Sequence, residues 1–67
     1  MEVLEEIEEA FLREAEVDAR HIRVEVTDHT ARLFGHVHSL KEATAATEAA
    51  ASAPGVAQVE SHLVVTP

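Results

Sequence analysis

The stretch HIRVEVTDHTARLFGHVH, residues 21–38, decides the fold, because two alternating runs flank a two-residue break. Residues 21–27 alternate apolar and polar side chains, and residues 30–38 do the same, which is typical of strands with one buried face. Asp28 and His29 between them have the length of a hairpin turn whose two residues take positive φ. We therefore predict an antiparallel hairpin over this stretch.

A two-residue turn also predicts the register, because each residue pairs with the one equally far from the turn. The outward pairs are chemically compatible and suggest a salt bridge, a cation–π contact and a Thr–Thr pair: Glu25 with Arg32, Arg23 with Phe34, and Thr27 with Thr30. On the same face we expect His21 opposite His36. On the core side Ile22 lies opposite Gly35. We expect this glycine to leave room for a helix packed against the sheet.

Two segments predict helices. Residues 2–16, EVLEEIEEAFLREAE, place apolar side chains on one face at three- and four-residue spacing: Val3, Leu4, Ile7, Ala10, Phe11 and Ala15. Ser39-Leu40-Lys41-Glu42 is a capping box that opens a second helix through Ala53, and Pro54-Gly55 ends it. The inward stripe of this helix is expected to hold small side chains after its first residue: Leu40, Ala43, Ala46 (or Thr47), Ala50 and Ala53.

Residues 56–65, VAQVESHLVV, alternate again and predict a third strand. Its inward side holds Val59, Ser61, Leu63 and Val65, and its outward side holds Glu60, His62 and Val64. The element order αββαβ predicts an α+β two-layer sandwich, a three-stranded sheet with both helices on its one apolar face, in a single domain over residues 1–67. We expect a mixed sheet with strand order 1-2-3. An antiparallel sheet with order 2-1-3 is the alternative.

The negative charge of the chain is concentrated near its N-terminus, and it makes some classes of binding partner unsuitable. The 67 residues carry a formal net charge of −8. Residues 1–18 hold seven Glu and Asp18 against Arg13, which leaves −7 there. Without a basic stripe we expect no nucleic acid partner, and direct attraction to anionic lipid is weak. The absence of Cys excludes disulfides and thiolate sites.

The N-terminus has no basic region followed by an apolar run, so it lacks the pattern of a signal peptide. If Met1 is native, we expect a cytoplasmic location. A segment trimmed from a longer chain would be equally compatible with a periplasmic or membrane-associated one.

Histidines are the only candidates for a metal site. His21, His36, His38 and His62 fall on one face of the predicted sheet, and imidazoles bind zinc, copper or nickel. No Cys and no convergent carboxylate accompanies them, and His29 lies at a turn. We therefore expect solvated polar residues here, with no metal and no cofactor.

No group of residues predicts catalysis. Ser39 is used as a helix cap, and no Ser, His and acid fall into a nucleophilic arrangement. A two-layer domain of this size also has little room for a pocket. We expect a protein that is not an enzyme and has no catalytic residues.

The outward sheet face is the candidate interaction surface. With both helices on the other side it would be bare, and it carries two apolar side chains that a solvated face does not need, Phe34 and Val64. Together with Arg23 and Arg32 they predict a contact surface.

The stretch from His21 to Val65 resembles the BON domain, named for bacterial osmotically induced and nodulation proteins. The pattern of that family is V-x-V, a turn, L-x-G-x-V, an Ala-rich helix, G-V-x-x-V and L-x-V. Its landmarks here are Val24 and Val26, Leu33, Gly35 and Val37, residues 43–53, Gly55, Val56 and Val59, and Leu63 and Val65. The turn glycine of the family is His29 in this chain. The resemblance implies an αββαβ fold and a role in binding phospholipid or tethering proteins at membranes, often in the periplasm.

Two hypotheses follow. The first is a non-catalytic module that associates with a phospholipid membrane surface through the hairpin and outer face, around Arg23, Arg32 and Phe34. The second is a protein-interaction or homo-oligomerisation module that uses the same face.

Overall fold

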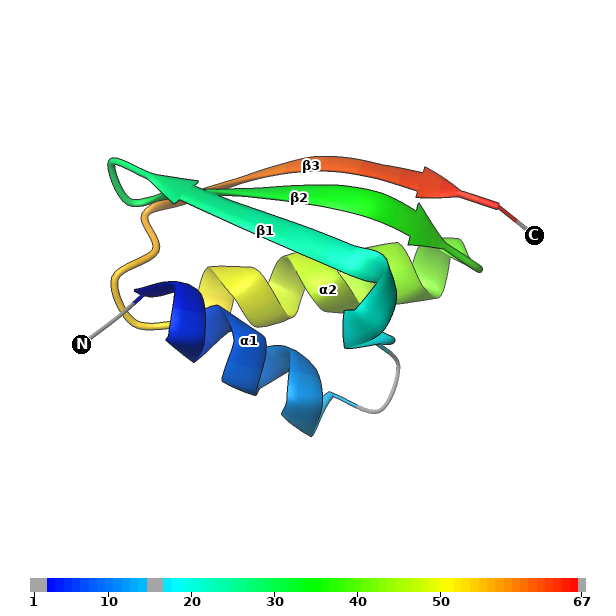
Figure 1. Cartoon of the computed structure of the whole chain (residues 1–67), viewed down its shortest axis with the longest axis horizontal. Helices are drawn as coiled ribbons and strands as arrows, with labels where there is room; N and C mark the ends of the chain where they lie inside the picture. The colour runs from blue at the N-terminus through cyan, green and yellow to red at the C-terminus, as the bar shows by residue number, and fades with distance from the viewer. Residues whose placement is uncertain (1–2, 15–16, 67) are drawn as a thin grey trace.

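The computed structural model describes residues 3–14 and 17–66. Its elements, in chain order, are α1 (Val3–Arg13), a short 3-10 helix η1 (Ala19–His21), β1 (Ile22–Thr27), β2 (Thr30–Val37), α2 (Leu40–Ser52) and β3 (Gln58–Val65). The strands form one layer and both helices lie together on one of its faces (Figure 1). The predicted αββαβ two-layer sandwich of the α+β class is confirmed.

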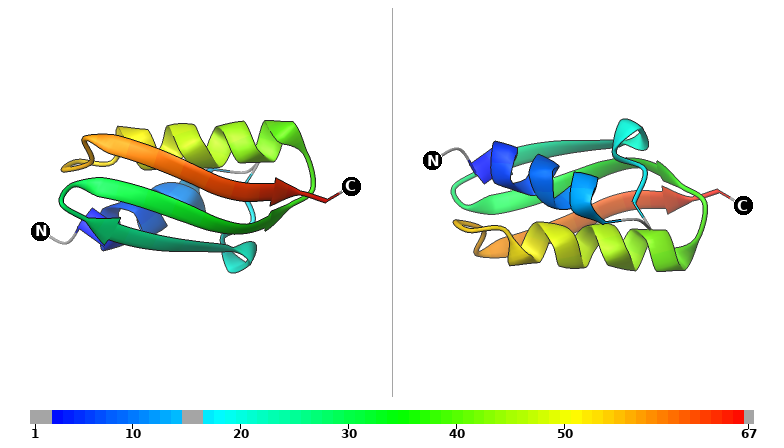
Figure 2. Two further views of the ribbon diagram at one scale, coloured as in Figure 1. Left: turned by 90° about the horizontal axis from the view of Figure 1, so that it is seen from above. Right: turned by 90° about the horizontal axis from the view of Figure 1, so that it is seen from below.

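The sheet is mixed, with strand order β1-β2-β3. β1 pairs antiparallel with β2, and β2 pairs parallel with β3. The expected order is therefore confirmed, and the alternative antiparallel sheet is wrong. Seen from below, α1 crosses under the β1 side of the sheet and α2 runs along the β3 side (Figure 2).

The hairpin turn has the predicted conformation. Asp28 and His29 have φ of 51° and 64°, so both take the left-handed region that a two-residue turn requires. The register runs from Ile22 opposite Gly35 to Thr27 opposite Thr30, as predicted. The His29 ring helps to hold the turn, because its Nδ1 lies 3.0 Å from the Gly55 carbonyl oxygen in the α2–β3 connection.

The start of the first strand differs from the prediction. His21 belongs to η1 and not to β1, so it does not pair with His36. The role predicted for Gly35 is also wrong. Its φ is 137°, and a Cβ there would overlap the carbonyl oxygen of His21. Gly35 is thus required by the close approach of the backbone at the η1–β1 junction, and not by a helix.

The core lies between the sheet and the two helices. Its largest fully buried side chains are Phe11, Ile7, Leu33 and Val37. Each such side chain contributes about 1.5–3 kcal/mol relative to an exposed one. The predicted apolar face of α1 is confirmed at Ile7, Ala10 and Phe11; residues 2, 15 and 16 of the predicted helix, including Ala15, lie outside the described residues.

The inward face of α2 is confirmed for its alanines, with Ala46, Ala50 and Ala53 buried. Leu40 is the exception, because its side chain is 73% exposed. It is the first residue of α2, and the first turn buries Glu42 in place of Leu40. The buried apolar side chains of this helix are therefore all alanines.

The strand β3 is less buried than its alternation predicts. Val59 and Leu63 are half-buried and pack against the core, but Ser61 and Val65 are exposed. This strand is an edge of the sheet, so it has a neighbour on one side only. The hydroxyl of Ser61, which was predicted on the inward side, accepts a long bond of 3.5 Å from the Leu63 N–H.

Candidate interaction surface

The face of the sheet opposite the helices presents side chains from all three strands. The cross-strand register aligns them in rows, of which two lie near the centre: Arg23–Phe34–His62 and Glu25–Arg32–Glu60. A third pair, His36 with Val64, lies toward the C-terminal ends of β2 and β3. We call the surface made by these residues the open face. All four residues of the predicted interaction surface lie on it: Arg23, Arg32, Phe34 and Val64.

The row of Arg23, Phe34 and His62 is a stack. The rings of Phe34 and His62 lie 5.0 Å apart between centroids and within 8° of parallel. The Arg23 guanidinium carbon lies 4.8 Å from the centroid of Phe34, as the cation–π prediction expected. Phe34 is therefore half-buried between two polar neighbours, while the Arg23 side chain remains 69% exposed.

The neighbouring row is charged, and its pairing differs from the prediction. Arg32 pairs with Glu60 at 3.3 Å, and Glu25 pairs along its own strand with Arg23 at 3.6 Å. The predicted salt bridge between Glu25 and Arg32 is wrong, although the two residues are cross-strand partners. Arg32 lies between two glutamates in the register, Glu25 on β1 and Glu60 on β3, and it forms its ion pair with Glu60. The open face therefore carries two arginines and two glutamates and is charge-balanced.

The four histidines considered as metal ligands are divided among different contacts. His21 and His38 pack edge to face with centroids 5.7 Å apart, at the junction of η1 and the strand ends. His36 Nδ1 lies 3.1 Å from the Thr66 hydroxyl oxygen, and His62 stacks on Phe34. Within residues 3–14 and 17–66, no three His, Cys, Asp or Glu side chains gather as metal ligands would.

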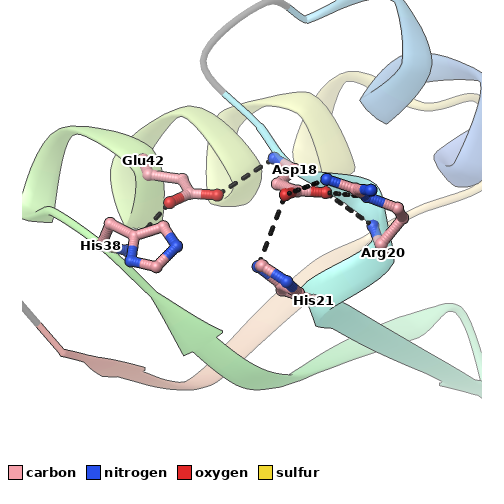
Figure 3. Close-up of polar contacts among 5 residues, drawn as sticks. All are labelled: Asp18, Arg20, His21, His38 and Glu42. Carbon is pink, nitrogen blue, oxygen red and sulfur yellow. Dashed lines mark hydrogen bonds and ion pairs between the residues drawn. The ribbon is translucent and has the colours of Figure 1, made fainter.

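The burial of one carboxylate, that of Glu42, was not predicted from the sequence (Figure 3). Glu42 is 6% exposed and accepts backbone N–H bonds from Asp18 at 3.0 Å and from His38 at 2.9 Å. These two bonds hold the pKa of Glu42 below its ordinary value, and the bond from the His38 N–H has the larger effect. The capping-box pattern indicated this residue, and the Ser39 hydroxyl does accept the Glu42 N–H. Its second partner lies 24 residues away, which no local pattern shows.

Asp18 begins a second polar group beside Glu42. Its carboxylate accepts two bonds from the Arg20 guanidinium, both at 3.1 Å, and lies 3.5 Å from His21 Nδ1. The hydrogen bond from Arg20 lowers the pKa of Asp18 from 3.8 to about 2. Through the bond from the Asp18 N–H to Glu42, this group links η1 to the first turn of α2. It stabilises one end of the sandwich and lies away from the centre of the open face.

On the helix side, a groove of about 310 Å³ runs between α1 and the edge of β1. It is lined mainly by apolar side chains: Glu8, Phe11, Leu12, Ile22 and Val24. Leu12 is 78% exposed, the highest value among the large apolar residues described. In the part of the chain that the structure describes, neither helix has the length and apolar character that a bilayer crossing requires.

Comparison with known proteins agrees with the geometry of the fold. The family model described as BON domain matches residues 2–67, essentially the whole chain. No curated protein matches the sequence.

Proposed function

The chain belongs to the BON domain family of small binding modules, and we propose that it binds phospholipid membrane surfaces through its open face, without catalysis. The observation that carries this proposal is the placement of Phe34 and Arg23 together at the centre of a sheet face that no helix covers. An aromatic ring beside a guanidinium suits the boundary between acyl chains and phosphates.

The fold separates this surface from the acidic part of the chain. The glutamates of α1 lie on the helix side of the sheet, whereas the open face on the other side is charge-balanced (Figure 1). Repulsion between α1 and an anionic membrane is weakened by this separation, because exposed charges are screened over about 8–10 Å at physiological salt. The net charge of −8 therefore opposes docking by the open face only weakly.

The two arginines differ in their freedom to meet a lipid phosphate. The ion pair of Arg23 with Glu25 is long, at 3.6 Å, and both side chains are exposed. Such pairs contribute about 0–1 kcal/mol, so a phosphate can replace the carboxylate at little cost. Arg32 is held closer to Glu60 and is less exposed. Arg23 is therefore the residue that we assign to the phosphate, and Phe34 the residue that enters the interface.

Vesicle flotation tests the proposal with phosphatidylcholine vesicles and with vesicles that also contain phosphatidylglycerol. Phe34→Ser should weaken binding to both by about tenfold, since it removes an aromatic ring from the interface. Arg23→Gln should weaken binding mainly to the anionic vesicles, by about fivefold. The matched controls are Leu40→Ser and Arg13→Gln, which change an exposed leucine and an arginine on the helix layer.

Binding by the wild type with these differences would support the open face. Absence of the wild-type chain from both kinds of floated vesicle, or equal losses for the control variants, would contradict the proposal.

A protein partner on the same face is the second candidate, favoured by one observation. Arg32 and Glu60 already neutralise each other, so part of the face suits a mixed protein surface better than a uniformly anionic one. Salt distinguishes the two: binding to anionic vesicles through Arg23 should weaken as the ionic strength rises, whereas packing of a protein around Phe34 and Val64 should not.

A further inference from the structure

The outer edge of β1 has no neighbouring strand in the described part of the chain. β1 is an edge strand, with β2 on its other side. In a two-residue hairpin the residues flanking the turn, Thr27 and Thr30, form a hydrogen-bonded pair, and such pairs alternate along the strand. The N–H and C=O groups of Ile22, Val24 and Val26 therefore point away from β2, toward the free edge.

This edge is complementary to itself. If β1 of a second copy pairs antiparallel with Val24 on the two-fold axis, Val24 faces Val24 and Ile22 faces Val26 of the other copy. These are the residues whose backbone groups point toward the free edge, so the bonding pattern matches without a shift in register. On the open face the same register sets Arg23 of each copy opposite Glu25 of the other. Opposite charges thus face one another twice across the axis.

The helix side of the edge has two hollows, which are lined by apolar side chains together with some acidic ones. The groove between α1 and β1 carries Leu12 beside Ile22. A second hollow at the other end of the strand carries Leu4 beside Val26. Because Ile22 faces Val26 of the second copy in the proposed register, the Leu12 end of each copy meets the Leu4 end of the other. The pairing would cover Leu12, which the fold of one copy leaves 78% exposed.

We propose that the edge of β1 binds a second copy of this chain, giving a two-fold dimer with a continuous sheet of six strands, three from each copy. Exposed edge strands pair readily with other chains, and β1 has no proline, lysine or bulge against such pairing. The Arg23–Glu25 contact within one chain is long and exposed, so its exchange for the same contact between chains costs little.

The other edge of the sheet suits this pairing less well. In β3, Glu60 already bonds Arg32 within the sheet, and the inward side carries the polar Ser61. Seen from above, α2 extends past β3, where a second copy would have to approach (Figure 2). The rest of the open face remains uncovered in a β1-edge dimer, so lipid binding and dimerisation share only Arg23. Leu12→Lys tests the dimer and Phe34→Ser tests lipid binding, so failure of one proposal can be told from failure of the other.

A charge exchange between two variants tests the dimer by sedimentation equilibrium of the whole chain. The wild type should show a monomer–dimer equilibrium. Arg23→Glu alone sets glutamate against glutamate across the axis, and Glu25→Arg alone sets arginine against arginine. Each should weaken dimerisation by at least about tenfold. An equimolar mixture of the two variants restores unlike charges at both positions and should form a heterodimer.

A second pair of variants tests the dimer without changing any residue of β1, whose substitution could itself disturb the sheet. Leu12→Lys should abolish the dimer, whereas Leu40→Lys, equally exposed but on α2, should leave it intact. Amide NMR spectra confirm that each variant is folded. A wild type that stays monomeric at millimolar concentration would overturn the proposal. So would a dimer that resists Leu12→Lys, or a mixture of the charge variants that stays monomeric.

Discussion

The Glu42 carboxylate accepts a hydrogen bond of 3.0 Å from the backbone N–H of Asp18, and so joins the first turn of α2 to the segment that leads into β1. The other oxygen of the same carboxylate accepts the His38 N–H. One side chain therefore satisfies two backbone donors from segments on either side of the hairpin, at the end of the sheet where α1 and α2 both connect to strands (Figure 3).

Glu42→Gln should lower the free energy of unfolding by about 1–3 kcal/mol. An amide has only one acceptor oxygen, so one of the two backbone N–H groups would face the side-chain NH2 group without a partner. Chemical denaturation measures the change. Glu48→Gln, an exposed site on the same helix, is the matched control and should change stability by less than about 0.5 kcal/mol. Equal effects at the two positions would show that the buried carboxylate has no special role.

The stability of the fold should decrease in acid because of Asp18 and Glu42. The folded pKa of Asp18 is lowered from 3.8 to about 2, and that of Glu42 is lowered from 4.5, mainly by the His38 N–H. A lowered folded pKa adds stability that is fully present above the unfolded pKa and is lost as the pH falls through the folded value. Stability should thus decrease below about 4.5 and continue to fall toward about 2.

Thermal unfolding across this pH range measures the loss. Asp18→Asn should flatten the curve between 3.8 and about 2, since the asparagine does not titrate. An Asp18→Asn curve with the wild-type slope in that window would contradict the assignment to Asp18.

Gly35→Ala should cost more than about 3 kcal/mol of stability, or prevent folding. Its φ of 137° strains any other residue by about 1–3 kcal/mol, and the added Cβ would overlap the His21 carbonyl oxygen. Gly55→Ala is the comparison. That Cβ would meet the Val3 side chain at 2.7 Å, which can move, so the cost should be smaller although φ is also positive. Denaturation midpoints rank the two variants, and a smaller cost at Gly35 would contradict this account.

Much of the fold follows from local patterns in the sequence. The two-residue gap at Asp28 and His29 was sufficient to predict the turn, and with it the register of every β1–β2 pair. The strand order followed from the capping box and the Ala-rich helix, because a helix between two strands favours a parallel neighbour. These features depend on residues close together in the chain.

The errors concern contacts between distant segments. Gly35 was placed under a helix, but its constraint comes from the backbone of His21, where η1 replaces the expected first residue of the strand. Arg32 pairs with Glu60 and not with Glu25. This pairing depends on side-chain geometry between β2 and β3, which local sequence does not give. The open face itself was predicted, because one-sided alternation places Arg23, Phe34 and Val64 together whatever their exact partners.

The most direct test of the proposed function is a titration of the isotope-labelled chain with phospholipid nanodiscs, neutral and anionic, followed by amide NMR. Shifts or line broadening are expected at the open face, centred on Arg23, Phe34 and His62, with little change along α2. Changes centred on the helices, or none with either nanodisc, would contradict membrane association through the open face and leave a protein partner as its function.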